Sequence, residues 1–108
     1  MTRAMTPEEM SRTIIGHLRM MADYWAHAKI HPRSAAEDGG EVQARLSGLV
    51  HSILVMFDGG ASGIPALDIV ARPHPDDEAF RRSEGEDDYW PDGAVINSVN
   101  MHDMWYRK

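Results

Sequence analysis

The sequence predicts one α+β domain over residues 1–108, in which two long helices and a short C-terminal helix pack on a minimal two-stranded sheet. Three observations lead to this fold class. Apolar residues recur at helical spacing in two segments, 10–28 and 42–57. Two short segments, 66–72 and 94–96, have the composition of strands. The length of 108 residues is near the commonest size of a single domain.

The first helix has a clear start signal. Thr6 is the expected N-cap, and Glu9 stands three residues later, as a capping box requires. Apolar side chains then follow at spacings of three and four, which places them on one face. Pro32 disfavours helical geometry in the residue before it, so the helix is expected to end by Ile30 or His31.

A second helix is expected from the capping-box pair Asp38 and Glu41. Its apolar residues in 42–57 cover an arc of about 160°, which is wider than one contact needs. This helix should therefore lie between the first helix and the sheet. Gly48 lowers helix stability by about 1 kcal/mol relative to alanine, and close approach of another element would account for it. A strand over 53–57 is the competing interpretation.

The C-terminal half predicts shorter elements. Residues 66–72 alternate as a strand does, and 94–96 is the candidate partner strand. The acidic residues 76–78 favour the start of a short helix that ends at about Ser83. A last helix is expected from residue 97 or 98 to about Tyr106.

Composition narrows the class of protein. The net charge is −6, which disfavours a general nucleic-acid binder. The chain has no cysteine, which excludes disulfides and thiolate metal sites and fits a reducing, cytoplasmic compartment. The longest apolar run, 53–57, is far shorter than the roughly 20 residues of a membrane span, so no membrane partner is expected. The N-terminus lacks the pattern of a signal peptide.

The first candidate site is a stripe of Asp23, His27 and His31 on the first helix. Residues four apart lie above one another on successive turns, and carboxylate and imidazole are suitable ligands for a divalent metal. A further ligand would have to come from another element. The alternative interpretation is a solvated polar face that ends in a fraying turn. His51 is expected on the outward, solvated face of the second helix.

Two other clusters could line a pocket. His74 precedes Asp76 and Asp77, and a histidine beside carboxylates can supply a general base or metal ligands. Helix capping explains the acids equally well. The second cluster comprises His102, Trp105 and Tyr106, for which docking of a terminal helix onto the core is the alternative.

Residues 49–60, 68–78 and 101–106 resemble a group of small uncharacterised bacterial and prophage-type proteins. The resemblance covers roughly the C-terminal two thirds of the chain. It implies a bacterial or phage cytoplasmic origin and carries no known activity. It draws attention to His74, Asp76, Asp77 and His102 within these segments, whereas Asp23, His27 and His31 lie outside them.

The resulting hypothesis is a small cytoplasmic protein-interaction or regulatory module whose partner is another protein or a second copy of itself. It rests on the small size, the acidic charge and the wide apolar arc of residues 42–57. No cofactor is expected. The alternative is a metal-binding protein or metal-dependent hydrolase that holds a divalent metal in a His/Asp cluster. A small-ligand pocket lined by aromatic side chains is a third hypothesis.

Overall fold

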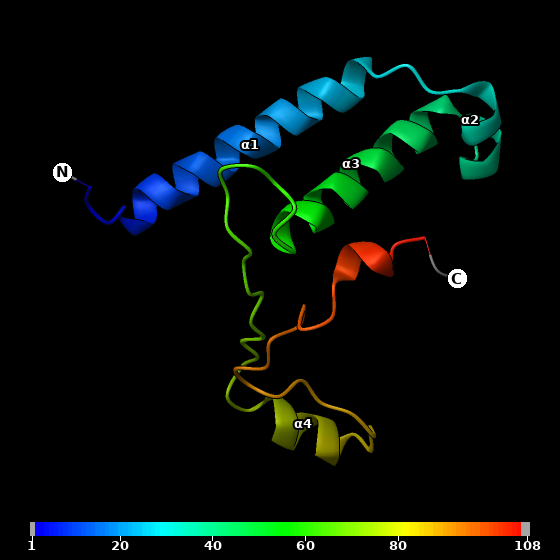
Figure 1. Ribbon diagram of the computed structural model, residues 1–108. Coiled ribbons are helices and arrows are strands. Elements are labelled where there is room, and N and C mark those ends of the chain that lie inside the picture. The colour runs from blue at the N-terminus through cyan, green and yellow to red at the C-terminus, as the bar shows by residue number, and fades with distance from the viewer. Residues whose placement is uncertain (1, 107–108) are drawn as a thin grey trace.

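A computed structural model describes residues 2–106, which fold into a helical layer and an arm (Figure 1). The helical layer comprises α1 (Pro7–His27), α2 (Pro32–Asp38) and α3 (Glu41–Phe57), and α1 and α3 lie side by side. The arm, residues 68–97, projects from this layer and contains α4 (Asp77–Ser83). The chain then returns to α3 through the short 3-10 helix η1 (Met101–Asp103).

The start of α1 follows the prediction. The Thr6 hydroxyl accepts a hydrogen bond from the Glu9 amide at 3.2 Å, and the Glu9 carboxylate accepts one from the Thr6 amide at 3.0 Å. The ion pair with Arg3, at 2.7 Å, lowers the pKa of Glu9 to about 2. The helix ends at His27, before the limit of Ile30 or His31 that Pro32 was expected to set, and Ala28 has extended backbone geometry.

The segment between the two long helices corrects the predicted start of α3. Residues 32–38 form a separate helix, α2, whose N-terminus is capped by the ring of His31. Gly39 and Gly40 follow with φ of 91° and 124°, a region that favours glycine. Asp38 therefore belongs to the end of α2, and α3 begins at Glu41 without a side-chain cap.

The core lies between α1, α3 and the loop that follows α3. Met21, Met56 and Ile64 form its buried cluster. Gly48 lies directly under the ring of Trp25, and a Cβ atom at position 48 would overlap that ring. This contact agrees with the expectation that another element approaches Gly48 closely. The α3 helix contacts α1, α2 and η1 rather than a sheet.

The predicted α+β class is wrong, because the described residues form helices and no sheet. The two predicted strands do lie beside each other, but they share only the isolated antiparallel bridge between Val70 and Val95. Beyond this bridge the Asn97 side chain accepts from the Ile69 amide at 2.8 Å and donates to the Leu67 carbonyl at 2.7 Å. A side chain thus occupies the positions that a partner backbone would fill in a ladder.

The predicted C-terminal helix is also shorter than expected. It is reduced to η1, in which the His102 amide is held by a tertiary contact: it donates to the Asp58 carboxylate at 2.9 Å. A helix of a few residues is marginal because its first turn is costly to form. Docking onto α3 therefore determines the path of this segment.

The molecule is expanded for its length. Its radius of gyration is 18.0 Å, whereas a compact domain of 108 residues has roughly 13 Å. Apolar side chains are exposed along the layer and along the arm, and Val42 and Phe80 are 68% and 60% exposed. No helix within residues 2–106 combines the length and the apolar composition that crossing a membrane requires.

Candidate functional site

The Asp23/His27/His31 stripe does not converge on one point. His27 Nδ1 lies 3.0 Å from the Asp23 carbonyl oxygen and 3.6 Å from its carboxylate, and both side chains are about four-fifths exposed. His31 lies beyond the end of α1, where its Nδ1 accepts a hydrogen bond from the Arg33 amide at 3.1 Å. Within residues 2–106, no group of three histidine, aspartate or glutamate side chains could hold a metal ion.

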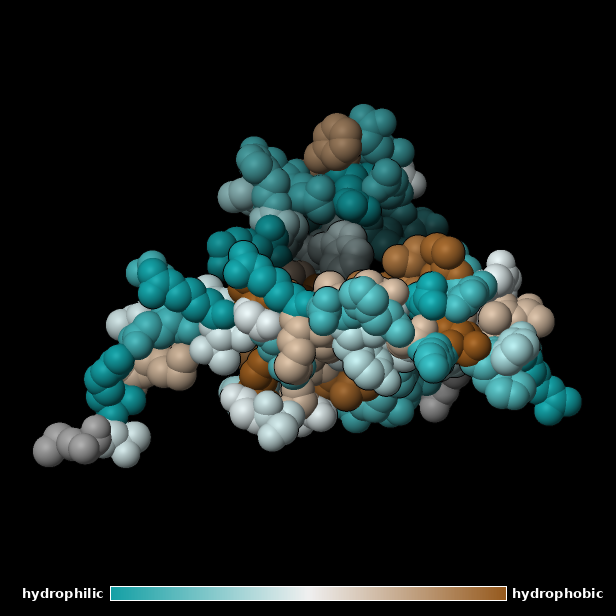
Figure 2. Space-filling view, turned by 90° about the horizontal axis from the view of Figure 1, so that it is seen from above, coloured by the Kyte–Doolittle hydropathy of each residue, from teal (hydrophilic) through white to brown (hydrophobic). Residues whose placement is uncertain are grey.

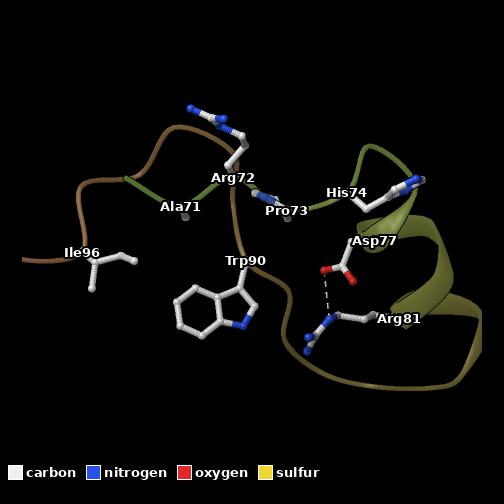
Figure 3. A pocket seen from close by; sticks show the side chains of 8 residues that line it. All are labelled: Ala71, Arg72, Pro73, His74, Asp77, Arg81, Trp90 and Ile96. Carbon is white, nitrogen blue, oxygen red and sulfur yellow. Dashed lines mark hydrogen bonds and ion pairs between the residues drawn. The ribbon is translucent and has the colours of Figure 1, made fainter. Parts of the chain in front are cut away.

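The second cluster lies on the arm, where it borders an open cavity of about 290 Å³ (Figure 3). His74 Nδ1 accepts a hydrogen bond from the Asp76 amide at 3.1 Å, which fixes the turn just before α4. Asp77 forms an ion pair with Arg81 at 3.0 Å, and this pair faces the Trp90 ring across the cavity. Asp76 occupies the N-cap position of α4, but its side chain forms no capping hydrogen bond, so the acid-capping interpretation holds for the position of this residue and not for its side chain.

The third cluster packs onto α3, away from the arm (Figure 1). Trp105 Nε1 donates to the Ser47 hydroxyl at 3.0 Å. The centre of the Tyr106 ring lies 5.2 Å from that of His51, which is half-buried rather than solvated as predicted. His102, Trp105 and Tyr106 are thus brought together, but they are separated from His74, Asp76 and Asp77.

A buried aspartate fixes this third cluster. The Asp58 side chain is 1% exposed, and its Oδ2 lies 2.7 Å from His102 Nδ1 and accepts the His102 amide at 2.9 Å. Burial raises the pKa of Asp58, but the hydrogen bonds from His102 and the other polar contacts together lower it by more, so the pKa lies below its usual value. The other imidazole nitrogen faces Asp103 at 3.3 Å. The hydrogen-bonded pair of Asp58 and His102 therefore attaches the C-terminal turn to the end of α3, and we call this pair the clasp.

Three residues of α3 and its C-cap that sequence reasoning passed over carry these contacts. Ser47 accepts from Trp105, and Ser52 accepts from Trp25 Nε1 at 2.9 Å. Asp58 pairs with a histidine 44 residues away. The only local signal is that each indole N–H needs an acceptor once it is buried. That need does not identify the acceptor.

A further hollow lies between α1 and α3. It has a volume of about 230 Å³ and an almost wholly apolar lining, and we call it the α1/α3 groove. Val42 and Leu46 stand on its α3 wall and are 68% and 53% exposed. Figure 2 shows the molecule from above, and on this side apolar side chains lie among polar ones. The groove is lined by Ala22, Trp25, Ala26, Val42, Arg45, Leu46 and Leu49.

The groove and the arm differ in charge. Residues 68–97 contain nine of the 17 acidic and three of the 11 basic residues, so this segment alone carries −6. The rest of the chain is balanced, with eight acidic and eight basic residues. Arg45, the one charged residue of the groove lining, forms an ion pair with Glu41 at 2.7 Å and donates to the Ala28 carbonyl at 3.0 Å. The groove is therefore apolar and electrically compensated.

Searches for similar proteins add no further assignment to this geometry. Comparisons with protein-family models, with curated proteins and with solved structures find no match to this chain.

Proposed function

We propose that this chain is a protein-interaction module whose helical layer is completed by another polypeptide at the α1/α3 groove. The observation that carries this proposal is the exposure of Val42 and Leu46, at 68% and 53%, on the wall of an apolar hollow. Apolar side chains that gather around a hollow, unlike single scattered ones, are typical of interaction sites.

The sparse core supports the same proposal. Met56 is the fully buried large side chain of residues 2–106, and the leucines and isoleucines of α3 all remain partly accessible. A small domain is only marginally stable, so incomplete burial leaves little reserve. A partner that binds the folded chain and covers this surface would stabilise the fold through mass action.

We do not propose the alternative function, a metal-binding protein or metal-dependent hydrolase. It required Asp23, His27 and His31 to meet a further ligand, but His31 caps α2 and the other two side chains point into solvent. The His74 cluster lies on the arm and the His102 cluster on α3, so they do not supply that ligand together. No observation favours a hydrolase over an interaction module.

Binding of an apolar fluorescent dye tests whether the groove is open to a ligand. At high dilution the chain should bind the dye, and Leu46→Glu should weaken this binding. Phe80→Glu is the matched control, since Phe80 is similarly exposed but lies on the arm. A monomeric chain that binds no dye, or whose dye binding both variants affect equally, would contradict the proposal.

A further inference from the structure

We propose that an open cavity between α1, α2, α3 and the C-terminal turn is a binding site for a small, uncharged aromatic molecule. The cavity has a volume of about 480 Å³. Sites for small molecules commonly have volumes of roughly 300–1,000 Å³. The cavity is distinct from the α1/α3 groove, although Trp25 lines both hollows. The inference therefore adds a second site and does not depend on the partner at the groove.

Aromatic rings from two distant parts of the chain border this cavity. Tyr24 and Trp25 come from α1, and Tyr106 comes from the C-terminal turn. The Tyr24 and Trp25 rings are arranged edge to face, with their centres 5.2 Å apart and their planes at 89°. Tyr24 and Tyr106 are 62% and 56% exposed, so both rings are accessible to a ligand. A flat ring in the cavity can therefore make stacked and edge-to-face contacts, the two geometries that aromatic pairs favour.

The Trp25 ring is fixed in position by contacts with α3. Its Nε1 donates to the Ser52 hydroxyl at 2.9 Å, and the ring lies against Gly48, where a Cβ atom would overlap it. Gly48 and Ala44 also line the cavity, so this part of α3 adds almost no side-chain volume beside the ring. A wall that is already in place lowers the cost of ordering side chains when a ligand binds.

The clasp between Asp58 and His102 positions the third ring. Asp58 Oδ2 lies 2.7 Å from His102 Nδ1, and Trp105 donates to the Ser47 hydroxyl at 3.0 Å. Both contacts hold the few residues that precede Tyr106, so they keep its ring at the border of the cavity. Asp58 and His102 are therefore positioning residues in this inference, since neither lines the cavity.

The polar side chains of the lining favour an uncharged ligand. Lys29 and Glu37 carry opposite charges, so the lining has no net charge while His31 is neutral. The Ser34 hydroxyl and the two tyrosine hydroxyls are neutral groups that can both donate and accept a hydrogen bond. These groups suit an aromatic ring that carries one neutral hydrogen-bonding group, and a phenol is the simplest molecule of this class.

Nuclear magnetic resonance of the ¹⁵N-labelled chain tests the inference, with phenol as the probe and cyclohexanol as its non-aromatic match. Each of the three tryptophans gives its own indole N–H signal. Phenol should shift the Trp25 signal to saturation and leave that of Trp90, which is 54% exposed on the arm, in place. Cyclohexanol should bind about fivefold more weakly or less, because it lacks aromatic contacts. Equal shifts of both signals, or equal binding of the two probes, would overturn the inference.

Substitutions of tyrosine locate the site. Tyr24→Ala and Tyr106→Ala should each raise the dissociation constant of phenol by about fivefold, since each removes one aromatic contact. Tyr89→Ala is the matched control, because Tyr89 is 42% exposed but lies on the arm. Leu46→Glu in the groove should also leave phenol binding unchanged, which separates this site from the groove. Unchanged binding in both Tyr24→Ala and Tyr106→Ala would show that phenol binds elsewhere.

Asp58→Asn tests the role of the clasp. This substitution changes no residue of the cavity lining, so it should weaken phenol binding only through the position of Tyr106. The Trp25 signal of the ligand-free variant should remain at its wild-type position, which shows that the α1 wall is intact. In the double variant Asp58→Asn with Tyr106→Ala, binding should be no weaker than in Tyr106→Ala alone. Additive losses would contradict the positioning role.

Discussion

Different kinds of interaction stabilise the helical layer and the arm of this protein. In the layer, α3 packs against α1, α2 and η1 and buries Met56 completely. On the arm, α4 contacts none of the other helices of residues 2–106, and Ala71 is the buried residue. The arm relies instead on local ion pairs, such as that of Asp77 with Arg81, and on backbone hydrogen bonds. Burial stabilises the layer, whereas local polar contacts shape the arm.

The two regions also differ in charge, and this difference separates their roles. The arm carries −6, and the remainder of the chain is balanced. Charge keeps surfaces solvated and apart, while neutral apolar surface favours association. The layer therefore presents neutral surface with exposed apolar side chains, and the arm presents the acidic surplus of the chain. Four experiments test how the stabilities of the layer and the arm differ, from the largest expected effect to the smallest.

Truncation of the core should separate the two regions most clearly. Met56→Ala should lower the free energy of unfolding by about 2–5 kcal/mol, because it removes buried contacts and leaves a cavity. Phe80→Ala on the arm should change it by less than about 0.5 kcal/mol, since Phe80 is 60% exposed. Chemical denaturation measures both values. Similar losses in the two variants would show that the arm is part of one cooperative core.

A pair of glycine variants sharpens the account of the layer. Gly48→Ala should destabilise the fold by about 1–3 kcal/mol, because the new methyl group would overlap the Trp25 ring. Gly16→Ala in α1 is the control: no atom lies within 4 Å of the added Cβ, so the variant should gain about 0.5–1 kcal/mol. Thermal melting measures the opposite signs. A gain at both positions would mean that Trp25 does not press on α3.

The clasp between the layer and the C-terminal turn should depend on pH. Asp58 has a lowered pKa when folded, so its carboxylate stabilises the fold above its unfolded value of about 3.9. This contribution is lost as the pH falls through the lower, folded pKa. At neutral pH, Asp58→Asn should lower the free energy of unfolding by about 1–3 kcal/mol.

The difference between wild type and Asp58→Asn should shrink as the pH falls below about 4, as urea denaturation at several pH values can measure. Asp23→Asn is the control, because the Asp23 side chain is 83% exposed. It should change the free energy of unfolding by less than about 0.5 kcal/mol at neutral pH. A difference for Asp58→Asn that persists into acid would indicate a packing effect rather than a charge effect.

The smallest effect should be centred on the junction between the arm and the layer. Asn97→Ala removes the bonds to Ile69 and Leu67, each of which contributes about 1 kcal/mol. Hydrogen exchange of the Ile69 and Ile96 amides should accelerate by about tenfold, while exchange within α3 should not change. Faster exchange in α3 as well would indicate that the two regions open together.

Local patterns predicted the elements that depend on neighbouring residues. The Thr6 and Glu9 capping box marked the start of α1, and the apolar periodicity of 42–57 marked α3. The acidic residues 76–78 also marked the start of α4. Each of these signals arises within a few residues of the structure it specifies, so one sequence is enough to interpret it.

The sheet could not be predicted in the same way. Alternation in 66–72 is compatible with a strand, but a strand needs a partner that offers its backbone groups in register. The Asn97 side chain takes two of those groups, at Ile69 and Leu67. Pro73 and Pro75 then follow without amide donors. The alternating pattern of residues 66–72 contains no information on whether a side chain or a partner strand will bond to these backbone groups.

The candidate sites show the same limit. The spacing of Asp23, His27 and His31 was regular, but the helix ended at His27 and separated the third residue from the first two. The contact of Asp58 with His102 spans 44 residues, and the contact of Ser47 with Trp105 spans 58. Sequence spacing carries no information on pairs at this separation when no motif links them.

By itself, the sequence determined where α1 begins, where α3 runs and how charge divides along the chain, because capping, periodicity and composition are local properties. Only the tertiary structure decided that no sheet forms, that the C-terminal turn is clasped by Asp58, and that an apolar groove stays open between α1 and α3. Those outcomes depend on which distant groups meet. Which distant groups come into contact is determined by the burial and hydrogen bonding of the whole chain rather than by any one segment.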